Sequence, residues 1–568
     1  MSDSREKPSA PAVQSAVKRF EKSLETLSPE RPDLLADWKK LRSGLDEILE
    51  ERSPPGISRQ LELPMILVAT PEIVSLPEHM GNLSNFIGTG DGGGLADISA
   101  AVVTELYQRG VNVHVTLPHY RNLFARLGKI SDEEYRAMIR GVQETKRIHF
   151  IDYGLFDGAK QVYEERSQLD RLMVRRAVAF MEGILYGLLP ALETRNDRIL
   201  LHCNDWMTGL LPSAARSRGI PSLITCHNIF TALETPRALH EQGIEVDPFL
   251  DHLYFERHPD SFPTAGMNYR QNRIDFLTSG LFAATRINTV SPTFLREIAE
   301  DAFSEFDLIP EPVRRVIAQR FEEGAASGIL NAPMPTADPR VDPLIHRKYD
   351  VGKMVRGKQA NKLEFQDKMG LGADAKAPLF FWPHRLVSPQ KGVELMLAAI
   401  PFVMTESPTA QFAIVANGQL DHVNACQRLM RAFPGRVAYH SFSRALSQLG
   451  KAGSDFILCP SLYEPCGIPQ VEGPRYGTLP IVRKTGGLAD TVEPLTTSKG
   501  NGFVFREYQV AGLVAGIREA LAFYARPLRT RARIVRRVMT ESSEQFTIGR
   551  TVDQYVDLYR EILGQEVA

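Results

Sequence analysis

The sequence predicts an α/β protein with two doubly wound domains, each built on a parallel sheet. From about residue 62 onward, apolar runs alternate with amphipathic segments, a pattern typical of strand–helix–strand units. The alternation occurs in two blocks, on either side of a Pro- and Ala-rich stretch near 300–350. The chain has 568 residues, which is enough for two large α/β domains and extensions.

The first block is expected to contain strands at the apolar runs 65–70, 111–117, 199–202 and 222–226. A helix is expected between the first two, because apolar side chains recur there at helical spacing, at Leu95, Ile98, Val102 and Leu106. Gly110 follows this helix at the position of a C-terminal cap.

The second block is more regular, with expected strands at 378–382, 411–416, 437–440, 455–459, 479–482 and 502–505. Helices are expected between these strands, and the tail beyond 505 is also expected to be helical. Residues 1–60 are polar and mostly helix-forming, so they are predicted to be an N-terminal helical extension peripheral to any chemistry.

Composition excludes several classes of protein. The chain has 67 Lys and Arg against 68 Asp and Glu, a net charge of −1, which argues against nucleic acid as a partner. No apolar run reaches the roughly 18 residues that span a membrane, and the N-terminus lacks the apolar core of a secretory signal. Five cysteines without a CxxC pair fit a reducing cytoplasm and argue against a disulfide scaffold or zinc ribbon. The expected location is therefore cytoplasmic.

One short motif occurs in both blocks. Residues 93–97 and 486–490 both read GGLAD, and in each copy two glycines lead into a helical pattern. Glycines let a phosphate approach the backbone, and the first turn of a helix offers free N–H donors and a positive dipole end. The matched pair predicts a ligand held between two doubly wound domains. The alternative is that each copy is only a tight turn between a strand and a helix.

Several longer segments resemble the bacterial glycogen and plant starch synthases, which are retaining glucosyltransferases of glycosyltransferase family 5. They follow the order of that family along the chain: GDGGGLADIS (90–99), LHCNDWMTGLLP (201–212), ITCHNI (224–229), INTVSPTFLREI (287–298), GILNAP (328–333), HRLVSPQKGVELML (384–397) and SLYEPCGIPQVEGPRYGTLPIVRKTGGLADTV (461–492). The segment 461–492 is the most specific of them.

The resemblance implies the GT-B fold, in which two Rossmann-like, doubly wound domains face each other across a cleft. It implies an N-terminal acceptor domain at 61–335 and a C-terminal donor domain for the nucleotide sugar at 336–535. It also implies that a C-terminal helix within 536–568 returns to the N-terminal domain.

The donor side can be argued from residue types. Glucosyl transfer makes negative charge grow on the leaving diphosphate, so fixed cations aimed at it lower the barrier. Arg385 and Lys391 are the candidate cations, and the resemblance implies that they hold the donor phosphates; the alternative is two ordinary surface cations. One more residue separates them than in the common form of the motif.

The resemblance also implies that Glu464 lies near the transferred glucose and that Glu472 contacts the ribose. The alternative for Glu464 is a carboxylate that only stabilises a helix N-terminus. Cys466 matches a family cysteine close to the sugar and is interpreted as packing rather than as a nucleophile. The other residues expected to bind the nucleotide sugar are glycines and a threonine: Gly93, Gly94, Gly467, Thr485, Gly486 and Gly487.

The acceptor side departs from the family's pattern. Asp91 stands where the glycine-rich loop usually has Lys, and Met207 stands where Asp-Trp-His has His. Asp275 and Thr278 replace a usual Asn and Lys. His227 could partly substitute for the lost imidazole, and a structural role is the alternative. The residues expected on the acceptor and sugar side are Asp91, Asp205, Met207, His227 and Asn228.

These observations favour a retaining transfer of glucose from ADP-glucose or UDP-glucose to the non-reducing end of an α-1,4-glucan. One alternative is a GT-B enzyme with a small-sugar acceptor, and another is a catalytically weakened homologue that binds glucan or nucleotide in a regulatory role. No cofactor or metal is expected, because cationic side chains take the place of a divalent ion and no cluster has metal-ligand spacing. The sequence does not decide between a monomer and a homo-oligomer.

Overall fold

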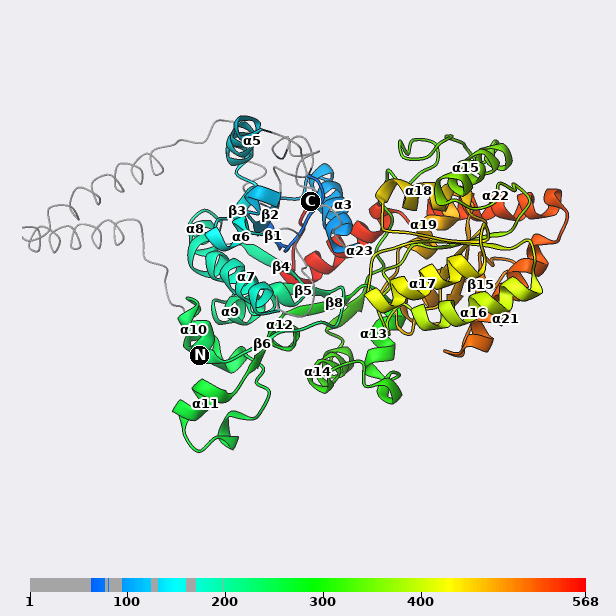
Figure 1. Cartoon of the computed structure of the whole chain (residues 1–568). Coiled ribbons are helices and arrows are strands. Elements are labelled where there is room, and N and C mark those ends of the chain that lie inside the picture. The colour runs from blue at the N-terminus through cyan, green and yellow to red at the C-terminus, as the bar shows by residue number, and fades with distance from the viewer. Residues whose placement is uncertain (1–62, 77–79, 81–93, 124–130, 160–169, 197) are drawn as a thin grey trace, which may run out of the picture. The chain divides into compact units, whose positions relative to one another are not determined.

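The computed structural model describes residues 63–76, 80, 94–123, 131–159, 170–196 and 198–568. The predicted extension at 1–60 and the candidates Asp91 and Gly93 lie outside these residues. Residues Leu63–Ala568 form one compact unit, which contains two large sheets (Figure 1).

The first sheet has seven parallel strands in the order β3-β2-β1-β4-β5-β8-β9. Their bounds are β1 Met65–Ala69, β2 Val113–Pro118, β3 Ile148–Ile151, β4 Ile199–Asn204, β5 Ser222–Cys226, β8 Arg286–Thr289 and β9 Ala326–Gly328. A short antiparallel pair, β6 (Leu233–Glu234) and β7 (Ile274–Asp275), lies outside this sheet. The strand order reverses between β1 and β4, and ligands of doubly wound sheets bind at the carboxyl ends beside such a reversal.

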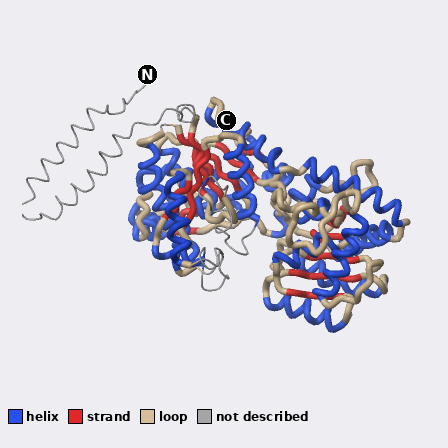
Figure 2. Tube along the Cα trace, turned by 90° about the horizontal axis from the view of Figure 1, so that it is seen from above, coloured by secondary structure: helices blue, strands red, loops and turns tan. Residues whose placement is uncertain are grey.

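Helices fill the connections between these strands, and in Figure 2 they lie on both sides of the strands. Their bounds are α3 Gly94–Gln108, α5 Asp132–Thr145, α6 Gly154–Asp157, α7 Asp170–Glu182, the π-helix η2 Gly183–Leu188, α8 Leu189–Glu193, α9 Leu211–Ser217, α10 Pro236–Glu241, α11 Ala265–Gln271, α12 Phe276–Ala283, α13 Pro292–Ala299 and α14 Glu311–Glu322. Helix α3 buries the four apolar residues from which it was predicted.

The second sheet has six parallel strands in the order β12-β11-β10-β13-β14-β15, with a reversal between β10 and β13. Their bounds are β10 Leu379–Trp382, β11 Gln411–Val415, β12 Val437–His440, β13 Phe456–Cys459, β14 Leu479–Arg483 and β15 Phe503–Phe505. The predicted fold class is confirmed: the chain contains two Rossmann-like domains, each on a parallel sheet.

The helices of the second half are α15 Met354–Met369, α16 Val393–Glu406, α17 Leu420–Ala432, α18 Arg444–Gly453, α19 Pro469–Arg475, α20 Gly486–Thr491, α21 Val510–Tyr524, α22 Leu528–Gln545 and α23 Ile548–Leu563. The last of them packs on the first sheet, beside α3 (Figure 1). The Tyr559 hydroxyl lies 2.7 Å from His202 Nδ1, and Asn288 Nδ2 donates to the Tyr555 hydroxyl at 3.1 Å. The chain therefore passes from the first sheet to the second and then returns.

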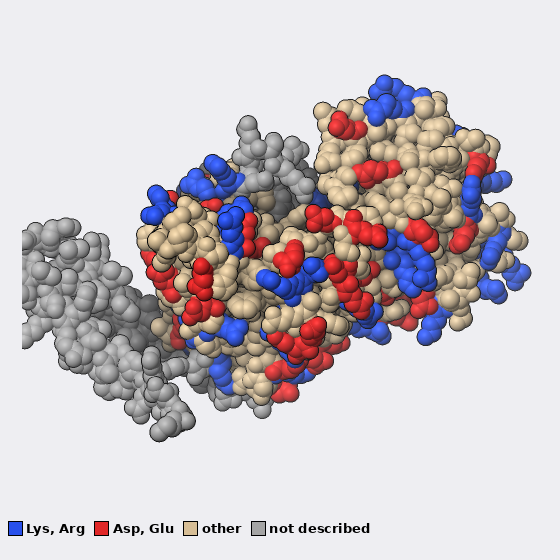
Figure 3. All heavy atoms as spheres, turned by 90° about the horizontal axis from the view of Figure 1, so that it is seen from below, with Lys and Arg blue, Asp and Glu red and all other residues tan. Residues whose placement is uncertain are grey.

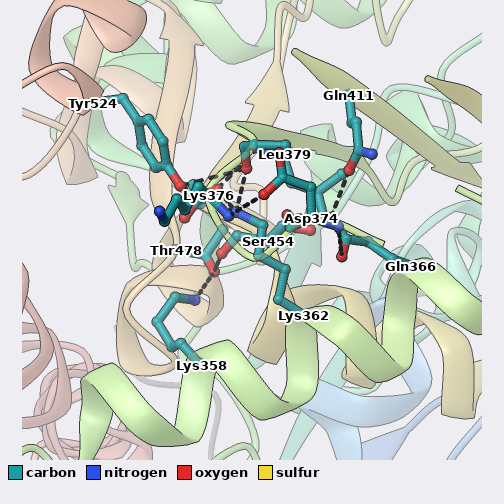
Figure 4. Close-up of polar contacts among 12 residues, drawn as sticks. Lys358, Lys362, Gln366, Asp374, Lys376, Leu379, Gln411, Ser454, Thr478 and Tyr524 are labelled. Atoms are coloured by element: carbon teal, nitrogen blue, oxygen red, sulfur yellow. Dashed lines mark hydrogen bonds and ion pairs between the residues drawn. The ribbon is translucent and has the colours of Figure 1, made fainter. Parts of the chain in front are cut away.

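A buried polar cluster fixes the amino ends of strands in the second sheet (Figure 4). Lys362 Nζ, on α15, lies 2.6 Å from Asp455 Oδ2 and also donates to the Ala377 carbonyl. Asp455, which directly precedes β13, accepts a hydrogen bond from Leu379 N at the start of β10. Lys358, one turn earlier on α15, donates to Thr478 Oγ1 at 2.8 Å. The cluster lies at the strand ends opposite those that bind ligands in such sheets.

The surface carries no broad field of one sign on the face shown in Figure 3, where acidic and basic side chains alternate. This distribution agrees with the net charge of −1. Within the described ranges, no helix has the length and apolar character that crossing a membrane requires.

Candidate active site

A buried ion pair lies at the carboxyl ends of β10 and β13. Lys391 Nζ lies 2.8 Å and 2.7 Å from the two carboxylate oxygens of Glu464, and Ser461 Oγ donates to the same carboxylate at 2.9 Å. Burial raises the pKa of Glu464, but Lys391 and Ser461 outweigh it and hold the pKa below its ordinary value. Glu464 is therefore a charged carboxylate in a largely dry environment, paired with a single ammonium group.

The loops that carry these two side chains are joined through the backbone. Leu462 N donates to the Gln390 carbonyl at 2.9 Å, which ties the Glu464 loop to the Lys391 loop. Gly392 begins α16 with φ +71°, and a Cβ there would lie 2.2 Å from the Pro460 carbonyl oxygen. Only glycine permits both that conformation and that approach. The glycine after Lys391 thus brings the cation to the carboxylate.

The two predicted cations have different surroundings. Lys391 is engaged by Glu464, whereas Arg385 is exposed and has no hydrogen-bond or ion-pair partner among the residues that the structure describes. His384, next to Arg385, is buried, and its Nε2 lies 2.9 Å from the Leu458 carbonyl oxygen. Burial, reinforced by the charge of Lys391, lowers the pKa of His384 to about 4. The imidazole is therefore neutral, and Arg385 is the cation left free for an anionic ligand.

The next predicted residues follow Glu464 along the chain. Glu472, on α19, is paired with Lys451 at 2.6 Å, and Lys451 also donates to Gln448. Burial raises the pKa of the Cys466 thiol to about 12, so this cysteine is protonated and fits packing rather than nucleophilic attack. Gly467 adopts φ +74°, a left-handed conformation that turns the chain toward α19.

The glycine loop at the start of α20 already has protein partners. Gly486 N donates to Glu297 Oε2 at 2.9 Å, and Thr485 Oγ1 donates to the same oxygen at 3.1 Å. Gly487 N donates to the Glu464 carbonyl at 3.0 Å. The role of these residues toward donor phosphates stays a prediction. Glu297, on α13, was missed, although it lies within the recognised segment 287–298.

The two GGLAD copies both begin helices, since α3 starts at Gly94 and α20 at Gly486. Asp490 accepts hydrogen bonds from Ser291 Oγ at 2.5 Å and from Thr293 N at 3.0 Å, both in the first domain. Burial raises the pKa of Asp97, and the charges that act on it come from the second domain: Arg444, Glu472 and Lys451. Asp490 is therefore hydrogen-bonded to the opposite domain, whereas charges of the opposite domain only act on the pKa of Asp97.

On the predicted acceptor side, Asp205 organises the loop after β5. Its Oδ1 accepts hydrogen bonds from His227 N at 2.6 Å and Asn228 N at 3.3 Å, while its own φ is +56°. Burial raises the pKa of Asp205 to about 7. His227 Nε2 lies 3.0 Å from Asn204 Oδ1, and burial lowers the pKa of His227 to about 3, so the imidazole is neutral.

The family departures have structural roles in this chain. Met207 is buried in the core of the first domain, with 1% of its surface exposed. Asp275 caps α12, accepting from Thr278 N at 2.8 Å and from Thr231 Oγ1 at 2.6 Å. Asp91, another departure, lies outside the described residues. Across the described ranges, no group of three His, Cys, Asp or Glu side chains could hold a metal ion.

Comparison with known proteins agrees with this arrangement. The model of the starch synthase catalytic domain matches residues 86–309, and that of glycosyl transferases group 1 matches 365–536. The glycogen synthase of Edwardsiella ictaluri is 33% identical over 489 residues, covering 83% of this chain and 97% of that protein. The glycogen synthase of Exiguobacterium sibiricum is 30% identical over 496 residues, covering 82% of this chain and 95% of that protein.

The fold is shared with solved glycosyltransferases. The catalytic domain of starch synthase IV from Arabidopsis thaliana, bound to ADP and acarbose, has a TM-score of 0.69 at 23% identity and covers 89% of this chain and all of that one. Sucrose-phosphate synthase from Thermosynechococcus elongatus has a TM-score of 0.51 at 17% identity and covers 88% of this chain and 99% of its own. Two parallel-sheet domains, two glycosyltransferase domain matches and glycogen synthases 30–33% identical over most of their length show that the chain belongs to the glycogen and starch synthase family of glucosyltransferases.

Proposed function

We propose that the protein transfers glucose from ADP-glucose, or alternatively UDP-glucose, to the non-reducing end of an α-1,4-glucan with retention of configuration. The observation that carries the proposal is the buried pair Lys391–Glu464 at the carboxyl ends of β10 and β13, with the exposed cation Arg385 on the same loop as Lys391. The similarity of the chain to glycogen synthases supports a glucan acceptor and makes ADP-glucose the first donor to test. The cysteine usage supports a cytoplasmic location.

In this proposal, Arg385 and Lys391 bind the diphosphate of the donor, and no metal ion takes part. As the bond between glucose and diphosphate breaks, negative charge moves onto the phosphate oxygens, and the two fixed cations stabilise it. Before the donor binds, Glu464 compensates the charge of Lys391. Once the donor is bound, Lys391 shares its three N–H donors between Glu464 and the phosphate, and the Glu464 carboxylate is available to the hydroxyls of glucose.

A second candidate function is supported by one observation on the acceptor side. Met207, where the family has a sugar-contacting His, is buried in the core, and its thioether cannot donate a hydrogen bond to a sugar hydroxyl and is only a weak acceptor. That loss supports a different acceptor, such as a small sugar, or a weakened catalyst that binds nucleotide or glucan in a regulatory role.

A donor and acceptor screen tests these candidates. Radiolabelled ADP-glucose and UDP-glucose are each incubated with glycogen, with malto-oligosaccharides and with small sugars, and products are resolved by chain length. Lengthened glucan supports the proposal, and a disaccharide product supports the small-sugar alternative instead. Glu464→Gln should abolish transfer, whereas the exposed control Glu493→Gln should leave it unchanged. Background signal in both the wild type and Glu464→Gln would overturn the catalytic proposal.

A further inference from the structure

Helix α13 of the first domain packs directly on the loop that carries Glu464. The Phe294 ring stacks on the Tyr463 ring, with centroids 6.4 Å apart and planes inclined by 14°. Phe303, just beyond α13, contacts the same ring edge-on at 6.1 Å. Because Tyr463 directly precedes Glu464, a helix of one domain lies against the backbone that positions the carboxylate of the other.

Each domain contributes one carboxylate that accepts hydrogen bonds from the start of a helix in the other domain. Glu297, on α13, accepts hydrogen bonds from Gly486 N and Thr485 Oγ1 at the start of α20. Asp490, on α20, accepts from Thr293 N at 3.0 Å and Thr293 Oγ1 at 2.5 Å at the start of α13. The first turn of a helix has unpaired N–H groups and the positive end of the dipole, so a carboxylate stabilises it. Helices α13 and α20 therefore cap each other.

The helix turn that Glu297 caps is also hydrogen-bonded to the backbone of Glu464. Gly487 N, next to the capped Gly486 N, donates to the Glu464 carbonyl at 3.0 Å. A Cβ at Gly486 would lie 1.9 Å from that same carbonyl oxygen, and one at Gly487 would lie 2.1 Å from the Cys466 carbonyl oxygen. The start of α20 is thus in backbone contact with the Glu464–Cys466 loop and cannot shift toward it. Its other side is held by Glu297.

We propose that Glu297 is a positioning residue for glucosyl transfer. Its carboxylate fixes the first turn of α20, α20 fixes the backbone of Glu464 through Gly487, and the carboxylate of Glu464 is thereby held against Lys391. Glu297 hydrogen-bonds neither Lys391 nor Glu464; it acts through Thr485 and Gly486, which the sequence also predicts to bind the nucleotide sugar. The contact makes the geometry of the Glu464–Lys391 pair dependent on the docking of α13, so that the first domain takes part in building the donor site. The inference rests on the proposed function only for its activity readout.

The test uses three variants of the full chain. Glu297→Ala removes the acceptor, and Glu297→Gln keeps an oxygen that can accept from Gly486 N. The control is Glu300→Ala, at the exposed C-cap residue of the same helix. Hydrogen exchange is followed in the peptides that cover 461–467 and 485–492. We expect Glu297→Ala to speed exchange in both peptides about tenfold, because the first turn of α20 opens more often. Glu297→Gln and Glu300→Ala should exchange as the wild type does.

Activity gives the second readout. Glu297→Ala should lower kcat about tenfold or more, since small misplacements of catalytic groups are costly, while KM for the donor stays within about threefold. Glu297→Gln should restore kcat to within about threefold of the wild type. The proposal is overturned if Glu297→Ala leaves exchange in both peptides unchanged, or if Gln fails as completely as Ala. Should the wild type transfer no glucose, the proposed function fails, and exchange in the two peptides alone decides whether Glu297 positions the Glu464 loop.

Discussion

At the scale of single residues, the two predicted cations illustrate different energetic situations. Lys391 and Glu464 are both largely removed from water, so deleting one leaves the other as an uncompensated buried charge. Arg385 is exposed and has no hydrogen-bond or ion-pair partner in the described part of the chain, so its removal breaks no such contact there. Substituting Arg385 therefore separates a loss of function from a loss of stability.

We expect Arg385→Ala to lower kcat/KM for the nucleotide sugar by about 10²–10³, as removal of other donors that stabilise transition-state charge does. The midpoint of thermal unfolding should stay unchanged, because Arg385 is exposed. Initial-rate kinetics and a thermal melt check both expectations, with the exposed Lys499→Ala as the matched control. A loss of less than about threefold would show that Arg385 does not hold the diphosphate.

Asp205 gives a prediction about pH. Its carboxyl has an ordinary pKa of 3.8 and a pKa of about 7 in the fold, so between these values the folded state binds more protons than the unfolded chain. Stability should therefore fall as pH rises through this window. Asparagine keeps an oxygen for His227 N and Asn228 N but has no charge to bury, so Asp205→Asn should remove this slope. Urea unfolding at pH 5 and pH 8 measures the change of stability with pH. Asp205→Ala, which loses both hydrogen bonds, should be less stable than the wild type at both pH values.

The sequence could predict some site residues and not others for a physical reason. Arg385, Lys391 and Glu464 lie in compact motifs whose residue types already state a chemistry, and the fold brings the last two into contact. Glu297 has its partners at 485 and 486, nearly 190 positions along the chain, and one of them is a backbone N–H group. No local pattern encodes such a pairing. The signal that could have indicated it is a single acidic residue near the end of the recognised segment 287–298.

At the scale of elements, strands formed by buried apolar runs were easier to predict than a strand at the edge of a sheet. The expected strands at 65–70 and 222–226 agree with β1 and β5 to within one residue. Strand β9, by contrast, consists of Ala326, Ser327 and Gly328 at the edge of the first sheet, and no apolar run distinguishes it from a loop. Pairing with β8 makes it a strand, which is information that the local sequence does not contain.

The cluster of Figure 4 gives a prediction at this scale, because it joins one helix to the amino ends of several strands of the second sheet. Lys362→Met should cost about 3–5 kcal/mol in free energy of unfolding, since Asp455 loses its buried cation. The kcat of the folded protein should change little, because the cluster lies at the strand ends opposite Glu464. Urea unfolding and initial rates at low temperature separate the two effects. Lys368→Met, an exposed lysine of the same helix, is the control, and an equal loss in both variants would contradict the assignment.

At the scale of the whole molecule, α23 ties the end of the chain to the first domain. Val552, Tyr555 and Tyr559 of this helix belong to the hydrophobic core that contains β1 and β4. Arg109, directly after α3, donates to Asp553 at 2.5 Å and to the Gly549 carbonyl at 2.9 Å. The first core is thus completed by a segment that follows the second domain in sequence.

Tyr559→Phe tests this attachment without removing the helix. The substitution leaves His202 Nδ1 without its partner in a fully buried place, so we expect a loss of about 1–3 kcal/mol in free energy of unfolding. Urea unfolding followed by far-UV circular dichroism measures the loss. Tyr186→Phe, at an exposed tyrosine, should cost much less. Equal stability of Tyr559→Phe and the wild type would mean that the buried contact contributes nothing net.

The attachment of α23 also sets an order for synthesis. A ribosome releases the strands of the first sheet early, but the helix that covers His202 and Asn288 is made only after the whole second domain. Domains generally fold as units while the chain is being made, the N-terminal one first. Here the first domain has to wait, with part of its apolar core uncovered, while the second is translated. The domain that is begun first is the one that is finished last.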